Sequence, residues 1–399
     1  MKIVKVPAEV EEAFAPFREV MSRPQFRHFM RLVLGLILPC SKKKTVQAIA
    51  EGYAEGRDRS CLSRFLERSP WKVEKALNRA LGILHQQLPK KSGRLSYLIL
   101  DDSANEKTGR KIEGAGWFHD TMNLKRHIFG HNYVMSLAQV SGVCFPVGVR
   151  LYLKEQFCLE HGMTFKTKNE LAAELIAAYR PRCAGRVIVV FDGWYLNETV
   201  VAAVVKRGWH WVSRLKSNRR VKIGDLFWIV RDFIETLGEA ELRETDFIPR
   251  SHELPIIGCL RRGWLRKIGE VVMVFGGNQN GEWQTFASDL LNWSLEGLMR
   301  VYDRRWEIEC CFRESKQHLG LGESQARLLR CAVIHLHMVM IAWILLAALK
   351  LKHGLVNATI GDLCRWVGKQ VERDQIAFIR KYAASKKAPK KLELLLVAA

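Results

Sequence analysis

One short segment, residues 301–318 (VYDRRWEIECCFRESKQH), contains four residues that can bind phosphate or a metal ion. They are Tyr302, Arg305, Glu309 and Lys316. If the segment is helical, they fall within a sector of roughly 80° on one face, with only Phe312 between them. A solvated helix laced with ion pairs would scatter its charges more freely. Tyrosine and arginine can hold phosphate oxygens, and a carboxylate can hold Mg²⁺. The segment therefore predicts one wall of a phosphoryl-transfer site.

Two further carboxylates end short apolar runs. Asp101 follows the run in LSYLILDD, and Asp192 follows RVIVVF. Runs of this kind are typical of strands buried on both faces, and open α/β sheets bind ligands at the carboxyl ends of such strands. Aspartate also ends strands as a turn former or a helix cap, so either residue alone is weak evidence. Two metal ions held by such carboxylates could activate an attacking oxygen and stabilise a leaving one.

The composition favours a polyanionic partner. The chain has 399 residues and a formal net charge of +22, which favours nucleic acid first and an anionic membrane surface second. Its ten cysteines form no CxxC pair, and its first residues lack a long apolar core, so we expect a cytoplasmic, nucleoid-associated protein with free thiols. One apolar run, residues 332–349, approaches transmembrane length. We interpret it as a buried core helix, because it contains two histidines and stands alone in a charged protein.

The periodicity of the chain divides it into three parts. Residues 1–92 are predicted to form an all-helical N-terminal domain that binds DNA, ending in a linker at 88–94. Residues 93–350 alternate strands and helices, which indicates an α/β catalytic domain. Within it, residues 215–290 lose the alternation and form an insertion. Residues 351–399 read as a helical, basic tail.

Three segments, LILDDS, VIVVFDGWY and YDRRWEIECCFRESK, together resemble the catalytic segments of bacterial insertion-sequence DDE transposases. The branch they most resemble carries a Tyr-x2-Arg-x3-Glu-x6-Lys signature. The resemblance covers residues 95–350. It implies a ribonuclease-H-like core with a mostly β insertion, Mg²⁺-dependent cleavage at transposon ends, and strand transfer by the freed 3′-hydroxyl. Mn²⁺ may replace Mg²⁺.

Carried over residue by residue, the resemblance implies that Asp101, Asp192 and Glu309 are the catalytic metal ligands. Asp102 is the rival for the first position. Because successive strand residues face opposite sides, only one of the two should reach the metal. We expect it to be Asp101, since the family's aspartate usually follows the apolar run directly.

The remaining implied contacts are with double-stranded DNA, both terminal inverted repeats and target, bound by a homodimer. Tyr302, Arg305 and Lys316 would hold the DNA backbone near the cleaved end. Trp283 stands where some relatives carry a tryptophan that stacks on a flipped-out base. Lys107 and Arg110, in a basic glycine-rich segment, could also meet phosphates, although a solvated loop explains them equally well.

Other readings of the sequence predict different behaviour. A catalytically inactive DNA-binding protein derived from a transposase would need no carboxylate trio. A membrane-associated protein would use residues 332–349. A tyrosine recombinase would use Tyr302 as nucleophile, but it would leave the two strand-end aspartates unexplained.

Overall fold

The N-terminal part of the chain is helical. The computed structural model describes residues 3, 6–39, 43–53, 59–89, 95–119, 126–181, 185–250, 255–278 and 281–383. The predicted linker and the last part of the predicted tail therefore lie largely outside the described residues. The N-terminal helices are α1 (Ala8–Phe14), a 3₁₀ turn (Ala15–Glu19), α2 (Arg23–Ile37), α3 (Val46–Glu51), α4 (Arg59–Arg68) and α5 (Val73–Gln87).

A mixed sheet follows. Its elements are β1 (Leu95–Glu106), β2 (Gly116–His119), β3 (His127–Val140), β4 (Val143–Tyr152), α6 (Glu155–Glu160), α7 (Lys168–Ala178), β5 (Arg186–Phe191), α8 (Glu198–Lys206) and β6 (His210–Arg214). Strand β1 pairs antiparallel with β3, which pairs antiparallel with β4, and β1 pairs in parallel with β5, which pairs in parallel with β6. Leaving out the short β2, the order is β4-β3-β1-β5-β6. This mixed sheet, packed with helices, confirms the predicted α/β class.

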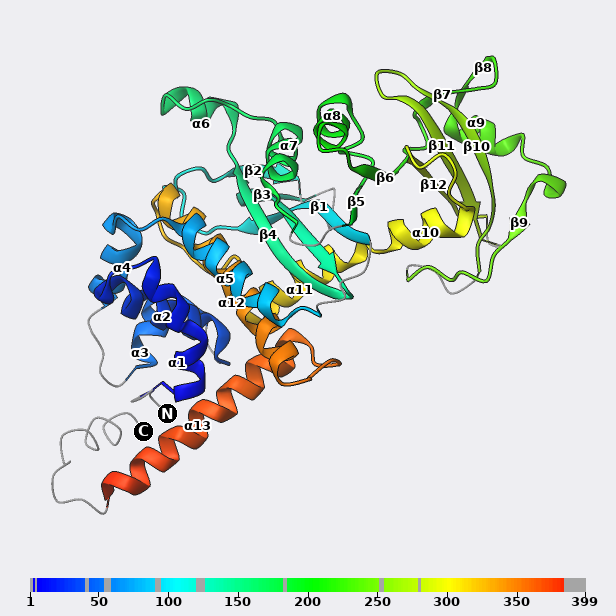
Figure 1. Cartoon of the computed structure of the whole chain (residues 1–399). Coiled ribbons are helices and arrows are strands. Elements are labelled where there is room, and N and C mark those ends of the chain that lie inside the picture. The colour runs from blue at the N-terminus through cyan, green and yellow to red at the C-terminus, as the bar shows by residue number, and fades with distance from the viewer. Residues whose placement is uncertain are drawn as a thin grey trace.

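The residues between β6 and the signature segment extend the same sheet. They form β7 (Arg220–Ile223), β8 (Leu226–Ile229), α9 (Val230–Glu235), a 3₁₀ turn (Glu239–Glu241), β9 (Arg243–Glu244), β10 (Ile257–Leu265), β11 (Gly269–Gly277) and β12 (Trp283–Ser288). Strand β12 pairs antiparallel with β6 and with β11, so the sheet continues from the core into the inserted strands. Figure 1 shows these strands projecting beyond the core, away from the N-terminal helices.

Four helices complete the described chain: α10 (Leu295–Asp303), α11 (Trp306–His318), α12 (Leu329–Lys352) and α13 (Ile360–Ala383). Helices α7 and α8 cover one face of the core sheet, while α11 and α12 lie on the other, where α12 also contacts α5 and α2 (Figure 1). Thr167 caps α7 and Asn197 caps α8, each accepting a hydrogen bond from a first-turn amide.

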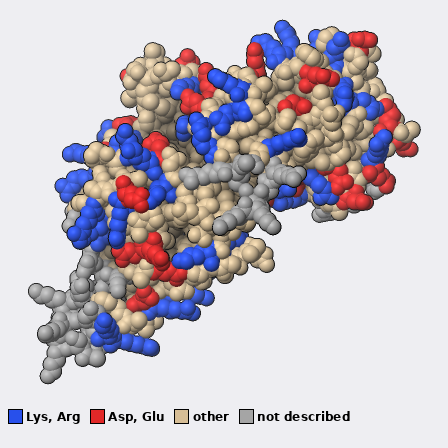
Figure 2. Space-filling model, viewed as in Figure 1, with Lys and Arg blue, Asp and Glu red and all other residues tan. Residues whose placement is uncertain are grey.

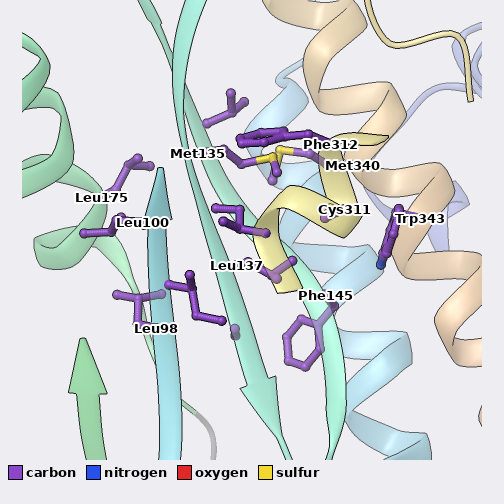
Figure 3. Close-up of a cluster of buried hydrophobic side chains, with 14 of the residues drawn as sticks. Leu98, Leu100, Met135, Leu137, Phe145, Leu175, Cys311, Phe312, Met340 and Trp343 are labelled. Atoms are coloured by element: carbon purple, nitrogen blue, oxygen red, sulfur yellow. The ribbon is translucent and has the colours of Figure 1, made fainter. Parts of the chain in front are cut away.

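Side chains alternate across β1 between the two helical layers. Leu98 and Leu100 lie on the side of Leu175 of α7, whereas Met135 and Leu137 of β3 lie toward α11 and α12 (Figure 3). All are nearly or fully buried, and burying such a side chain contributes about 1.5–3 kcal/mol each. Because the strand alternates, Asp102 continues the α7 side of β1 and Asp101 the α11 side.

Helix α12 contains the long apolar run. Among the described helices it alone is long and apolar enough to cross a membrane, and 89% of its most apolar window is buried within the protein. Trp343 of this helix donates a hydrogen bond to the carbonyl of Cys144 in β4. The helix therefore lies in the core, between the sheet and the N-terminal helices, as predicted.

Candidate active site

The register of the two central strands brings Asp101 and Asp192 to one edge of the sheet. Leu100 of β1 pairs with Phe191 of β5, so the next residue along each strand is one of the two aspartates. The Asp192 carboxylate accepts a 2.8 Å hydrogen bond from the backbone amide of Trp194, which fixes its orientation. Strand β1 continues to Glu106, so Asp101 does not end its strand as predicted; it lies where the parallel pairing with β5 stops, and the two aspartates line one side of a cleft.

The signature segment is not one helix, contrary to the prediction. Helix α10 ends at Asp303, and a turn with i to i+3 hydrogen bonds leads into α11. Arg250 of the inserted segment contacts both sides of the turn: its amide donates to Asp303, and its side chain pairs with Glu307 at 2.7 Å. Arg305 lies in this turn, at the start of α11.

Arg305 joins two of the candidate carboxylates. Its Nη1 donates to Oδ2 of Asp101 at 2.8 Å, and its Nη2 donates to Glu309, one turn along α11. Burial raises the pKa of Asp101 to about 7; Arg305 opposes this shift, and the Asp192 and Asp102 charges add to it. Asp101 therefore lies within electrostatic reach of both other aspartates.

In this arrangement the cation between Asp101 and Glu309 is a guanidinium. Within the described part of the chain, no group of three or more His, Cys, Asp or Glu side chains is close enough to hold a metal ion. The donor set nevertheless fits a hard divalent ion, because carboxylate oxygens are the ligands that Mg²⁺ prefers. A positive charge is already bound where two of the carboxylates converge.

Asp102 has different partners on the opposite face of β1. Lys168, in the first turn of α7, pairs with its Oδ2 at 2.6 Å, and the buried Tyr195 hydroxyl donates to its Oδ1 at 2.9 Å. Both oxygens are therefore occupied by side chains that tie β1 to its neighbours. Neither Lys168 nor Tyr195 was predicted as a site residue, because nothing in the sequence around them indicates a contact with Asp102.

All three candidate carboxylates line a single open cleft of about 1780 Å³. Small-molecule pockets usually measure roughly 300–1,000 Å³, so the cleft suits a larger substrate. Its cationic and aromatic lining includes Lys168, Arg214, Arg305, Arg313, Lys316, Trp117, Trp194 and Trp306. On the face shown in Figure 2, Lys and Arg side chains are spread widely, many of them over the N-terminal helices at the left.

Two other signature residues lie on the same wall. Lys316 donates to the Ser103 hydroxyl at 3.0 Å and to the carbonyl of Ala104 at 3.2 Å, so it reaches the edge of β1 beside Asp101. Tyr302 packs against Phe286, with 4.4 Å between ring centroids. Burial raises the pKa of Tyr302 to about 12, and the phenol is therefore neutral at physiological pH.

Three residues expected to contact DNA are placed differently from one another. Lys107 is buried, and its ammonium donates to the carbonyls of Gly322 at 3.1 Å and Ser324, so this structure does not offer it to DNA. The guanidinium carbon of Arg110 lies 4.9 Å from the ring centroid of Trp117, in a cation–π contact. Trp283 is half-buried at the start of β12 and packs on its cross-strand partner Gly277, where a Cβ would lie 3.0 Å from the indole.

The chain matches two family models. Residues 16–226 match the model described as DDE superfamily endonuclease, and residues 166–345 match the model described as transposase DDE domain. Between them the matches include Asp101, Asp192 and Glu309. No curated protein matches the chain. Among solved structures, the NurA nuclease from Sulfolobus solfataricus aligns over 65% of this chain and 98% of its own, at 10% identity and a TM-score of 0.25, a likeness too distant to bear on function.

Proposed function

The chain belongs to the DDE superfamily endonucleases, and from that premise we propose that it is a transposase that cuts DNA at transposon ends and joins the freed 3′-hydroxyl to target DNA. The observation that carries this proposal is the convergence of Asp101, Asp192 and Glu309 on one cleft, with Arg305 bound between the first and the last. The match to a transposase DDE domain, which spans the signature segment, supports the same reading.

Asp101, Asp192 and Glu309 would hold Mg²⁺ or, in its place, Mn²⁺. Metal bound there would polarise the scissile phosphate and lower the pKa of the attacking water or hydroxyl. Asp101 and Asp102 both line the cleft, but Asp101 is the better candidate, because it shares Arg305 with Glu309 whereas Asp102 pairs with Lys168 and Tyr195.

The neighbouring side chains suit a DNA backbone. Arg305 presents a planar fork of donors that can pass from a carboxylate to a phosphate, and Lys316 extends along the same wall. Burial raises the pKa of Tyr302 to about 12, so the phenol keeps its proton and can donate a hydrogen bond to a phosphate oxygen. A tyrosine recombinase would leave Asp101 and Asp192 without a role.

The partner would be double-stranded DNA, at the terminal inverted repeats and at the target. The net charge of +22 supports a binding mode dominated by phosphate contacts, with an affinity that falls steeply with salt. The N-terminal helices would add to these phosphate contacts; α4, for example, carries Arg59, Arg64 and Arg68. We expect at least a dimer on DNA, since two ends must be paired, and a place near the nucleoid. The apolar helix α12 is already packed in the core, which argues against a membrane partner.

The test uses plasmids that carry the genomic DNA flanking both sides of the coding sequence. With Mg²⁺, the wild type should nick at defined positions near the ends and leave 3′-hydroxyls. Asp101→Asn, Asp192→Asn and Glu309→Gln should each lose cleavage by roughly 10³-fold or more yet bind the same DNA. Glu296→Gln is the control, since Glu296 lies on α10, pairs with Arg300 and does not line the cleft.

A different outcome would favour an inactive descendant of a transposase. Tight, salt-sensitive DNA binding by the wild type, with no Mg²⁺- or Mn²⁺-dependent cleavage on any end-bearing substrate, would leave binding as the only function.

A further inference from the structure

Arg304 and Arg305 are consecutive residues in the turn between α10 and α11, and both contact strand β1. Arg305 pairs with Asp101. The guanidinium carbon of Arg304 lies 4.4 Å from the ring centroid of Tyr97, four residues earlier on the same strand. Because strand side chains alternate, Tyr97 and Asp101 share one face of β1, about 13 Å apart along it. The two arginines therefore hold the turn against β1 at two separate points.

Arg304 also bonds to the neighbouring strand. Its Nη1 donates a 2.7 Å hydrogen bond to Oε1 of Gln139 on β3. Gln139 is the direct cross-strand partner of Tyr97, so the guanidinium rests on a single cross-strand pair. Both partners are buried, and the Gln139 amide donates to Sγ of Cys144 at 3.3 Å, which leaves its oxygen for Arg304. Arg304 thus joins the turn to β1 and β3 at one place.

Stability alone is a poor explanation for an arginine at this position. Nε of Arg304 is buried and has no hydrogen-bond partner among the described residues, and a buried donor without a partner is destabilising. A well-packed apolar side chain would avoid that cost. Arg304 does not line the cleft, so it does not reach the DNA or a metal ion there. What its contacts do is fix the position of the residues that follow it.

We infer that Arg304 is a positioning residue for the catalytic carboxylates, an inference that rests on the proposed function. Asp101 belongs to β1, whereas Glu309 belongs to α11, which begins at Trp306, directly after the turn. Because Arg304 ties the start of α11 to β1, it sets the separation of these two carboxylates. A metal ion between them needs both oxygens at ligand distance, and a displacement of about 1 Å can slow a reaction roughly 10²-fold.

The first test measures Mn²⁺ affinity by electron paramagnetic resonance of the free ion, in full-length variants that all carry Arg305→Ala. That substitution removes the guanidinium that lies between Asp101 and Glu309, so a change in affinity reports the placement of the carboxylates. Adding Arg304→Gln should weaken Mn²⁺ binding roughly tenfold, as the loss of a residue that orients metal ligands does.

The second test measures cleavage with Arg305 intact. At saturating end-bearing DNA and Mg²⁺, Arg304→Gln should cut at least about tenfold more slowly than the wild type. Its affinity for the same DNA, measured in EDTA, should change by less than about twofold, because phosphate contacts dominate that affinity and Arg304 does not line the cleft. A loss in the maximal rate without a loss in binding is the result expected of misplaced catalytic groups.

Arg300→Gln is the matched control. Arg300 makes the same two kinds of contact on α10, a cation–π contact with Phe247 at 4.8 Å and a 2.6 Å hydrogen bond to Glu296, but outside the cleft. It should change neither Mn²⁺ affinity nor the cleavage rate. Gln139→Met removes the acceptor of Arg304 with little change in volume. It should act in the same direction as Arg304→Gln, and it gives the answer if Arg304→Gln fails to fold.

Wild-type cleavage rates and unchanged Mn²⁺ affinity in Arg304→Gln and Gln139→Met, with only a lower melting temperature, would overturn the inference. Arg304 would then stabilise the fold without placing the carboxylates, and the proposed function would stand as long as the wild type cuts end-bearing DNA. If the wild type does not cut and Arg305→Ala binds no Mn²⁺, the proposed function fails and this inference with it.

Discussion

Nη1 of Arg305 donates a 2.8 Å hydrogen bond to Oδ2 of Asp101, while Nη2 of the same side chain donates to Glu309. Two carboxylates from β1 and α11 thus share one cation supplied by the protein. Without it they would face each other across the cleft as like charges, which is unfavourable at short range. A divalent ion bound by these carboxylates would compete with the guanidinium.

Arg305→Ala should therefore bind Mn²⁺ more tightly than the wild type. Loss of the guanidinium leaves two carboxylates without their shared cation, and we expect affinity to rise about tenfold, or ~1.4 kcal/mol. The measurement is the rise in melting temperature with Mn²⁺, which follows ligand affinity for the folded state. Arg300→Ala removes an arginine from Glu296, outside the cleft, and should leave Mn²⁺ binding unchanged. Identical Mn²⁺ responses of wild type and Arg305→Ala would contradict the competition.

The two adjacent aspartates of β1 should separate in function. Asp101→Asn should abolish cleavage, whereas Asp102→Asn should reduce it about tenfold or less, because Asp102 holds Lys168 and Tyr195 rather than Arg305. Asp102→Asn should also lower the free energy of unfolding by roughly 1–3 kcal/mol, since it unpairs a largely buried lysine. Plasmid nicking and urea unfolding of both variants check this prediction. An active Asp101→Asn beside a dead Asp102→Asn would reverse the assignment.

Lys107 and Arg110 should also behave differently, although they lie close together in the sequence. Lys107→Met leaves two carbonyls of residues 322–324 without their donor and should cost roughly 1–3 kcal/mol of stability. It should not change the salt dependence of DNA binding. Arg110→Ala should do the reverse, with little loss of stability and a shallower salt slope. Parallel melting curves and salt titrations would show the contrast, and a lower salt slope for Lys107→Met would contradict it.

Two buried histidines should destabilise the protein in acid. Burial lowers the pKa of His131 and of His335 to about 4, and each ring bonds a backbone carbonyl, of Glu113 and Gly320 respectively. In the unfolded chain the same two histidines bind protons with a pKa of about 6.5. The stability that the neutral, buried rings provide is therefore complete above that pH and falls as the pH drops toward 4. The slope should approach 1.4 kcal/mol per pH unit for each histidine.

Urea unfolding of wild type and His335→Asn between pH 7.5 and 4.5 isolates this effect. The difference in unfolding free energy between the two proteins should shrink as pH falls. Asp101 acts in the opposite direction, because its raised pKa lowers stability as pH rises from about 4 to 7, but it is common to both proteins and cancels. A difference that stays constant with pH would refute the assignment to His335.

The sequence predicted those features that depend on local pattern. Buried apolar runs identified β1 and β5, and the residues that follow those runs identified Asp101 and Asp192, which the parallel register brings side by side although β1 itself continues to Glu106. Residues 332–349 are apolar apart from two histidines, and this pattern was sufficient to predict a core helix. Helical spacing also placed Arg305 and Glu309 on one face, and the two side chains do interact.

Features that depend on distant segments were not predictable. Arg250 of the insertion pairs with Asp303 and Glu307 on either side of the turn between α10 and α11, and no local window of the sequence contains these contacts. Lys107 looked like a loop cation, but carbonyls more than two hundred residues downstream bury it. Likewise, the pairing of β12 with β6, which joins the insertion to the core sheet, is set by tertiary packing rather than by strand propensity.

The most direct test of the account is the anomalous scattering of Mn²⁺ in crystals of the full chain bound to an end-bearing DNA. We predict a peak within ligand distance of carboxylate oxygens of Asp101 and Asp192, with Glu309 adjacent and the Arg305 guanidinium moved from Asp101 to a DNA phosphate. A peak coordinated by Asp102 instead, or no peak in contact with Asp101 and Asp192, would contradict it.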